Sequence, residues 1–137
     1  MGSPVKMVKC DGLAKPLGLY SHVSRVKSGT NLIFIAGQVA TSPQGDIVGE
    51  GDFATQVRQV FANLSAALDA AGASFAEVAK FTTFITRDGD IPKFMQTREK
   101  IFAEIYPSGK YPPNTLLVVS RLVHPEFLVE IEAVAVT

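Results

Sequence analysis

The stretch from Pro112 to Val136 constrains the fold more than any other part of the chain. It holds two apolar runs, Thr115–Leu122 and Phe127–Val136, which are rich in β-branched residues and short enough to be strands. The second run carries Glu130 and Glu132, and because strand side chains alternate, both carboxylates point to one face. A charge in an apolar strand costs free energy unless it is paired or hydrogen-bonded. This strand is therefore the best candidate for a functional site.

The composition predicts one ordered domain, residues 1–137, that neither enters a membrane nor binds nucleic acid. Of its 137 residues 47% are apolar, which excludes disorder. The 13 basic and 13 acidic residues cancel and no basic cluster stands out. A single cysteine, Cys10, allows no intrachain disulfide and no cysteine zinc cage. Since we find no signal peptide and no apolar run of about 20 residues, we expect a cytoplasmic protein.

Capping residues and helical periodicity predict two helices. The first begins at Phe53 after the N-cap Asp52, places Gln56 on its mostly polar side, and stops at Gly72. The second has Pro92 in its first turn, followed by a mainly apolar stripe.

Alternating apolar residues predict further strands at Leu19–Lys27, Leu32–Val39 and Lys80–Thr86. Turn residues at Ser28–Asn31 predict that the first two form a hairpin. Val5–Val8 is a candidate for a short edge strand. With the two C-terminal runs the order is ββ-α-β-α-ββ, which is an α+β fold.

The two C-terminal runs also predict an oligomer. Two helices cover only one face of a wide sheet, yet Leu116–Val119 and Ala133–Val136 are apolar on both faces. A bare apolar patch well above roughly 300–600 Å² is abnormal for a monomer. We therefore expect a homo-oligomer with clefts where its subunits meet.

Five blocks of the chain carry a family resemblance. They are PLGLYS from Pro16, LIFIAGQ from Leu32, VAKFTTF from Val78, Arg121-Leu122, and VEIEAVAV from Val129. Together they resemble the Rid/YjgF family, whose best-known members are enamine and imine deaminases. The resemblance implies a chorismate-mutase-like fold, with a mixed sheet packed on two helices. It also implies a homotrimer that binds a small-molecule ligand in clefts between subunits.

The clearest departure from the family is Asn114. In the deaminating members an arginine in a Pro-x-Arg-Ser/Thr pattern forms a two-pronged pair with the substrate carboxylate. Here the stretch is Pro112-Pro113-Asn114-Thr115, and the missing charge-assisted bonds would contribute about 1.5–3 kcal/mol. We therefore expect a substrate other than the common 2-aminoacrylate.

Three residues match positions that line the family's site: Tyr20, Gly37 and Glu130. Glu130 is the candidate general acid and base for a water that attacks an imine carbon, and Tyr20 is the second catalytic candidate. Gly37 marks either a strand bulge or a close approach by the ligand. His22 lies two residues from Tyr20 on the predicted strand, so both should project together, either toward the ligand or as surface polar residues.

The remaining candidates each have two interpretations. Asn114 either binds a polar group of the ligand or ends a strand, and Phe94 is either a wall of the cleft or a core residue. Arg98 on the second helix either replaces the missing cation or is solvated. Glu132 and Arg121 are interpreted as structural, with Lys80 or Arg121 as a partner for Glu132. The two histidines lack metal-ligand spacing and no phosphate-binding loop is present, so neither a metal nor a cofactor is expected.

Three functions remain open from the sequence. The leading one is an enamine or imine deaminase, a hydrolase of C=N bonds that releases a carbonyl compound and ammonia from a non-standard substrate. The alternative is a non-catalytic small-molecule binding protein or metabolite sensor that uses the same cleft. The third is an endoribonuclease, against which the zero net charge argues.

Overall fold

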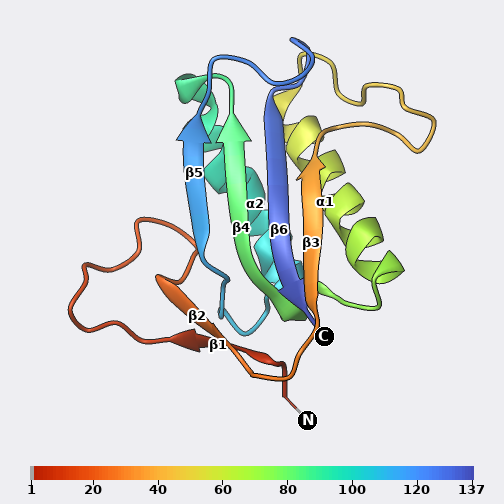
Figure 1. The fold of residues 1–137 in the computed structure, drawn as a ribbon. Coiled ribbons are helices and arrows are strands. Elements are labelled where there is room, and N and C mark those ends of the chain that lie inside the picture. The colour runs from red at the N-terminus through yellow and green to blue at the C-terminus, as the bar shows by residue number, and fades with distance from the viewer. Residues whose placement is uncertain (1) are drawn as a thin grey trace.

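The computed structural model describes residues 2–137 and consists of a four-stranded mixed sheet with two helices on one face, beside a separate two-stranded sheet (Figure 1). The helices are α1 (Phe53–Ala70) and α2 (Ile91–Ile105). A short 3-10 turn, Phe75–Glu77, lies between α1 and β4, and another, Asp88–Asp90, directly precedes α2. The strands are β1 (Val5–Val8), β2 (Val23–Val26), β3 (Leu32–Gln38), β4 (Val78–Ile85), β5 (Asn114–Val118) and β6 (Val129–Val136).

The larger sheet has the strand order β3-β6-β4-β5, in which only β4 and β5 are parallel. The expected α+β class with a mixed sheet on two helices is therefore confirmed. The C-terminal strand β6 lies between β3 and β4, so the carboxylates of Glu130 and Glu132 project from the interior of the sheet rather than from an edge.

The predicted hairpin between the second and third strands is wrong. Strand β2 pairs with β1, whereas β3 pairs with β6. Asn31 follows the turn and exchanges two backbone hydrogen bonds with Thr137, at 2.8 and 3.0 Å. After the turn, the chain therefore pairs with the C-terminal strand β6. This pairing joins segments that are distant in sequence, so turn residues alone do not reveal it.

Both ends of α1 follow the predicted capping. Asp52 is the N-cap, and its Oδ1 accepts a hydrogen bond from the Thr55 amide at 3.2 Å. At the other end Gly72 has φ +73°, a left-handed conformation that favours glycine. Helix α2 carries Pro92 in its first turn, as predicted.

The placement of Gln56 on the polar side of α1 is wrong, because this side chain is fully buried. Its Nε2 donates to the carbonyls of Gly49 at 3.2 Å and Glu126 at 2.9 Å, and its Oε1 accepts from the Leu128 amide at 2.9 Å. These bonds satisfy the buried amide and fix the segment that leads into β6.

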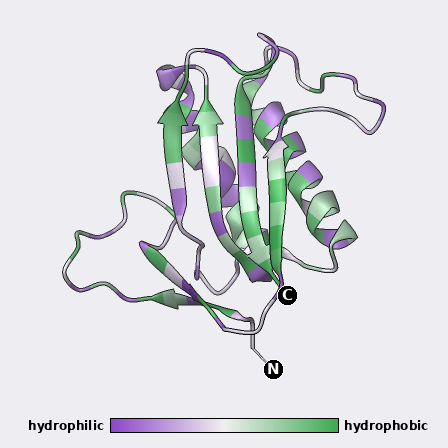
Figure 2. Cartoon of the chain, in the orientation of Figure 1, coloured by the Kyte–Doolittle hydropathy of each residue, from purple (hydrophilic) through white to green (hydrophobic). Residues whose placement is uncertain are grey.

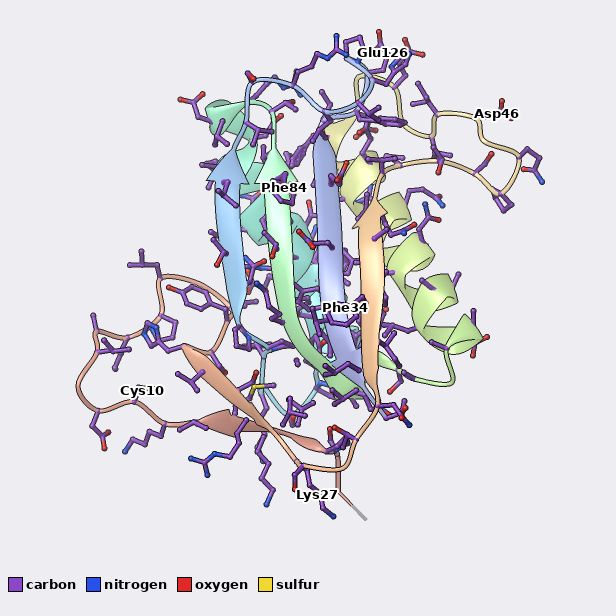
Figure 3. All side chains as sticks on the ribbon, viewed as in Figure 1. Cys10, Lys27, Phe34, Asp46, Phe84 and Glu126 are labelled. Atoms are coloured by element: carbon purple, nitrogen blue, oxygen red, sulfur yellow. The ribbon has the colours of Figure 1, made fainter. Side chains whose placement is uncertain are left out.

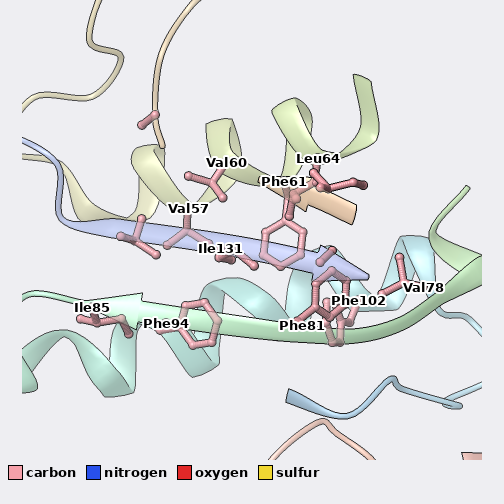
Figure 4. Packing of buried hydrophobic residues seen from close by; sticks show 14 of the residues in the cluster. Val57, Val60, Phe61, Leu64, Val78, Phe81, Ile85, Phe94, Phe102 and Ile131 are labelled. Atoms are coloured by element: carbon pink, nitrogen blue, oxygen red, sulfur yellow. The ribbon is translucent and has the colours of Figure 1, made fainter. Parts of the chain in front are cut away.

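The core lies between the sheet and the two helices. Figure 4 shows α1 side chains packed over Ile131 of β6, and Phe94 and Phe102 of α2 close to β4. The helices are apolar toward the sheet and polar toward solvent, while the strands are largely apolar (Figure 2). The buried members include Val57, Val60, Phe61, Leu64, Phe81, Ile85, Phe94, Phe102 and Ile131.

The opposite face of the larger sheet carries no helix (Figure 1). Phe34 and Leu32 on β3 are 75% and 59% exposed there, and Leu117 on β5 is 40% exposed. Figure 3 shows Phe34 and Phe84 on this face, which we call the open face. It is four strands wide, because β1 and β2 form their own sheet.

No helix within residues 2–137 is both long and apolar enough to cross a bilayer.

Candidate active site

Glu130 and Gly37 meet on the open face. Residues of β6 alternate in burial, and Glu130 belongs to the row that faces away from the helices. The pairing of β3 with β6 shifts between Ile35 and Gln38, and this bulge brings Gly37 beside Glu130. A Cβ atom at position 37 would lie 2.7 Å from the Glu130 Cδ atom and would overlap the carboxylate. Glycine at this position therefore lets the Glu130 carboxylate lie against the β3 backbone, and the shift in pairing confirms the bulge interpretation.

The half-buried Glu130 carboxylate is not neutralised by a cation. Burial raises the pKa of Glu130, and the nearby negative charge of Glu132 raises this pKa further. Within the described part of the chain, the only ion pairs join Lys9 to Asp11 and Arg87 to Asp90. A carboxyl group with a raised pKa exchanges protons more readily near neutral pH, as a general acid and base must.

The expected cationic partners of Glu132 do not contact it. The guanidinium of Arg121 donates instead to the carbonyls of Leu122 and Val123, at 3.1 and 3.3 Å, in the exposed loop before β6. The structural interpretation of Glu132 as one half of an ion pair is therefore wrong for the single chain.

Tyr20 and His22 form a second cluster, in a loop rather than on the predicted strand, because β2 begins only at Val23. The side chains bind their own loop: His22 Nε2 lies 2.6 Å from the Ala14 carbonyl, and the Tyr20 hydroxyl accepts from the Leu17 amide at 3.2 Å. Their rings are nevertheless neighbours, in a T-shaped contact with centroids 5.8 Å apart. The expectation that they project together holds, but for a different reason.

Asn114 joins Tyr20 and His22 at one hollow. The hollow has a volume of about 290 Å³ and is also lined by Ser21, Lys80, Phe81, Pro113 and Thr115. The loop is tied to the start of β5 because the Ser21 amide donates to the Pro112 carbonyl at 3.4 Å. Lys80, which the sequence suggested only as a partner for Glu132, adds an exposed cation to this wall.

The side chain of Asn114 faces the helices rather than the open face. Its Oδ1 accepts a hydrogen bond of 2.8 Å from the Thr83 hydroxyl, and Thr83 is 1% exposed. Thr83 shares its side of β4 with the core residues Phe81 and Ile85. Asn114 is thus held in place by a buried partner, and it is the first residue of the edge strand β5, as the strand-end interpretation expected.

The two clusters do not meet within one chain. Glu130 projects from β6 on the open face, whereas Asn114 projects toward the helices from the edge strand β5, with β4 between the two strands. Neither Gly37 nor Glu130 lines the hollow at Tyr20. The structure therefore holds two candidate half-sites, one acidic and one formed by Tyr20, His22 and Asn114.

Phe94 and Arg98 lie one turn apart on α2, and both are buried. Phe94 is 1% exposed within the core, so its ring offers no surface to a ligand in the single chain. The interpretation of Arg98 as a solvated arginine is wrong, because it is 2% exposed. Its guanidinium lies over the rings of Phe94 and Phe102, 5.0 and 5.6 Å from their centroids.

No group of three or more histidine, cysteine, aspartate or glutamate side chains converges in residues 2–137 in a way that could hold a metal ion.

These features define a class: a mixed sheet backed by two helices, with a glutamate from the central strand set against a glycine bulge of its neighbour. Residues 13–137 match the sequence model described as endoribonuclease L-PSP, and the chain belongs to this family, whose members also carry the names RutC, YjgF and Rid.

Individual relatives cover nearly the whole chain. A RutC family protein of Pyrococcus horikoshii is 35% identical over 95% of this chain and 96% of its own length. The 2-iminobutanoate/2-iminopropanoate deaminase of Escherichia coli is 31% identical over 88% of this chain and 91% of its own. The crystal structure of the Rid family protein YyfB of Yersinia pestis superposes with a TM-score of 0.85, at 30% identity over 96% of this chain and 98% of that one.

Proposed function

We propose that this protein is an enamine or imine deaminase, which hydrolyses a reactive nitrogen-containing metabolite to a carbonyl compound and ammonia. The observation that carries the proposal is Glu130, a half-buried carboxyl group with a raised pKa, no cation partner among residues 2–137, and a glycine backbone against it. A carboxylate held only to stabilise the fold would be expected to have a charged partner. Relatives named as deaminases, which are 25–31% identical to this chain, support this assignment.

The chemistry needs one proton acceptor that later becomes a donor. The Glu130 carboxylate takes a proton from a water molecule as the water oxygen bonds to the imine carbon. The protonated carboxyl then returns this proton to the nitrogen, which gives a carbinolamine. Glu130 next takes the proton of the new hydroxyl group and passes it to the nitrogen, the C–N bond breaks, and ammonia leaves as the carbonyl forms. The sum is imine plus water to carbonyl compound plus ammonia, so no cofactor is consumed. Tyr20 is the candidate for orienting the substrate from the other half-site.

We propose a homotrimer in which the two half-sites meet across subunits. The open face exposes Phe34 and Leu32, which favours its burial against a second copy of the chain. Such contact places Glu130 of one subunit opposite the Tyr20 hollow of its neighbour. A deaminase assembled in this way is inactive as a single chain.

The substrate is expected to differ from that of the E. coli relative named for 2-iminobutanoate and 2-iminopropanoate. Asn114 stands where a guanidinium would bind the carboxylate of such an acid, and its oxygen is already bonded to Thr83. The amide cannot supply a charged, two-pronged pair at this position.

The presence of Asn114 in place of an arginine also favours the second candidate function. This is a non-catalytic small-molecule binding protein or metabolite sensor that uses the same cleft between subunits. An endoribonuclease, the activity in the family's description, gains no support from a net charge of zero. Failure to bind single-stranded RNA at low salt would dispose of it.

Ammonia release from a panel of imines generated in solution tests the deaminase. Turnover should fall by at least about a hundredfold in Glu130→Gln, the size of a lost general acid and base. Glu99→Gln, an exposed residue on α2, is the matched control and should keep full turnover. Unchanged activity in Glu130→Gln would discard the mechanism, while tight ligand binding without any turnover would favour the binding protein.

A further inference from the structure

Two amide side chains of α1 hold the two segments of chain that meet where Gly37 lies against Glu130. The first is Gln56, which is fully buried. Its Nε2 donates to the Glu126 carbonyl and its Oε1 accepts from the Leu128 amide, both at 2.9 Å. Because Leu128 lies only two residues before Glu130, these bonds fix the place where β6 begins and its carboxylate projects.

The second amide is that of Asn63, seven residues further along α1. Its Nδ2 donates to the carbonyls of Val39 and Thr41, both at 3.0 Å. Gln59 supports it from the preceding turn, because the Gln59 Nε2 donates to the Asn63 Oδ1 at 2.9 Å and to the Thr41 carbonyl at 3.3 Å. Asn63 therefore holds the chain from two residues beyond Gly37 onwards.

The sheet itself holds the exit of the bulge by a single paired residue. Pairing of β3 with β6 resumes at Gln38, opposite Ile131, and β3 ends there. The partner of Thr41 is Ile47, in the loop that follows, so this bridge does not tie the segment to the sheet. The hydrogen bonds from α1 therefore set the path of residues 39–41 as they leave the bulge.

Helix α1 gives both amides a firm base. Gln56 and Asn63 are two turns apart, so they project from the same face of the helix. Val60 and Leu64 on the buried side of α1 are 0% exposed, and Figure 4 shows this side packed over Ile131 of β6. A change at Asn63 can therefore alter the segment that it holds while the helix stays in place.

From this arrangement we propose that Asn63 is a positioning residue of the deaminase. Acting from α1, it holds the exit of the bulge at a fixed separation from the start of β6, which Gln56 holds, and so keeps the Gly37 backbone against the Glu130 carboxylate. The inference rests on the proposed function because it assigns a residue to the same site. Asn63 acts only through Gly37, since it bonds the chain from the helix side of the sheet and Glu130 faces away from the helices.

Asn63→Leu tests the inference, because leucine has the branched shape of asparagine and favours a helix but has no donor. The variant should lower kcat by about ten- to a hundredfold, the effect of a misplaced catalytic group, and leave KM nearly unchanged. The pKa of Glu130, measured from the ¹³C signal of its carboxyl group, should fall toward its ordinary value, because a looser contact admits water. The charge of Glu132, which also raises this pKa, is unaltered. Asn63→Ala, which cannot crowd the segment, should give the same changes.

A double variant shows whether Asn63 acts through Gly37. In Gly37→Ala the added Cβ atom already displaces the carboxylate. Adding Asn63→Leu to Gly37→Ala should therefore reduce kcat much less than Asn63→Leu does alone. Full additivity of the two losses would show that Asn63 affects turnover by another route, and would reject the inference.

Leu68→Val is the matched control for a loss of stability. Leu68 is 1% exposed near the end of α1, and it bonds neither of the two segments. The shorter side chain should lower the free energy of unfolding by about 1 kcal/mol, as measured in urea. The folded protein should keep the kcat and the Glu130 pKa of the unaltered chain.

An unchanged Glu130 pKa and kcat in folded Asn63→Leu and Asn63→Ala would overturn the inference. Equal changes in Leu68→Val would also overturn it, because lost stability would then explain them. Failure of the deaminase gives a different result. If the unaltered protein releases no ammonia, a shifted Glu130 pKa in Asn63→Leu still shows that Asn63 positions this carboxyl group. Turnover that ignores Asn63→Leu rejects the positioning role and keeps the deaminase.

Discussion

The backbone of Gly37 lies so close to Glu130 that a Cβ atom at position 37 would stand 2.7 Å from the glutamate Cδ and 2.9 Å from its Cγ. The φ angle of Gly37 is not in the left-handed region, so the contact with the Glu130 side chain, rather than backbone strain, favours glycine here. Gly37→Ala should therefore displace the carboxylate and reduce deaminase turnover by at least about tenfold, while the free energy of unfolding changes by less than about 1 kcal/mol.

Steady-state ammonia release and urea unfolding measure the two effects of Gly37→Ala. Gly89→Ala is the matched control, since a Cβ atom there would meet nothing within 4 Å. Full turnover in Gly37→Ala would show that the position of this carboxylate is unimportant.

Glu132→Gln should move the acidic limb of the pH–rate profile to lower pH. Burial and the negative charge of Glu132 together raise the pKa of Glu130 above its usual value, and the substitution removes the second cause. The Glu130 pKa then falls, so its carboxylate form, which accepts the proton from water, persists to lower pH. The profile of kcat/KM against pH reports this shift.

Glu126→Gln, in the loop before β6, is the control for Glu132→Gln and should leave the profile unchanged. A limb that stays in place, or moves to higher pH, would contradict the assignment of Glu130 as the titrating base.

Asn114→Ala should destabilise the protein by about 1–3 kcal/mol, because it leaves the buried Thr83 hydroxyl without its acceptor. Thr83→Val removes the donor, and the double variant should cost less than the sum of the two single changes. Urea unfolding measures all three. Thr115→Ala, an exposed neighbour on the same strand, should have little effect, and simple additivity would mean that the hydrogen bond does not contribute.

Local signals in the sequence predicted the local parts of the fold. Asp52 and Gly72 bounded α1 because capping depends on residues close in sequence. The partner of β3 could not be predicted in this way, since Asn31 bonds with Thr137 at the far end of the chain. Gln56 was misplaced because its burial depends on carbonyls and an amide of the distant segment before β6.

The sequence named candidate residues in both halves of the site, but their positions could be anticipated only in the acidic half. Alternation in β6 and a glycine bulge in β3 were expected, and the structure brings Glu130 and Gly37 together there. The sequence left Arg98 either as a replacement cation or as a solvated residue, and only its packing against Phe94 and Phe102 shows that it is buried. Tyr20 was assigned to a strand by alternation, although its loop closes on itself.

Phe34→Asp should dissociate the proposed trimer, because residue 34 is 75% exposed on the open face, beside Val134 of β6. A carboxylate buried at a subunit contact without a partner costs several kcal/mol by the usual estimate, roughly enough to outweigh a moderate interface. Light scattering should give the mass of one chain, and turnover should vanish because Glu130 loses its opposite half-site. Ala66→Asp on the exposed side of α1 should stay trimeric and active, and a trimeric Phe34→Asp would refute the arrangement.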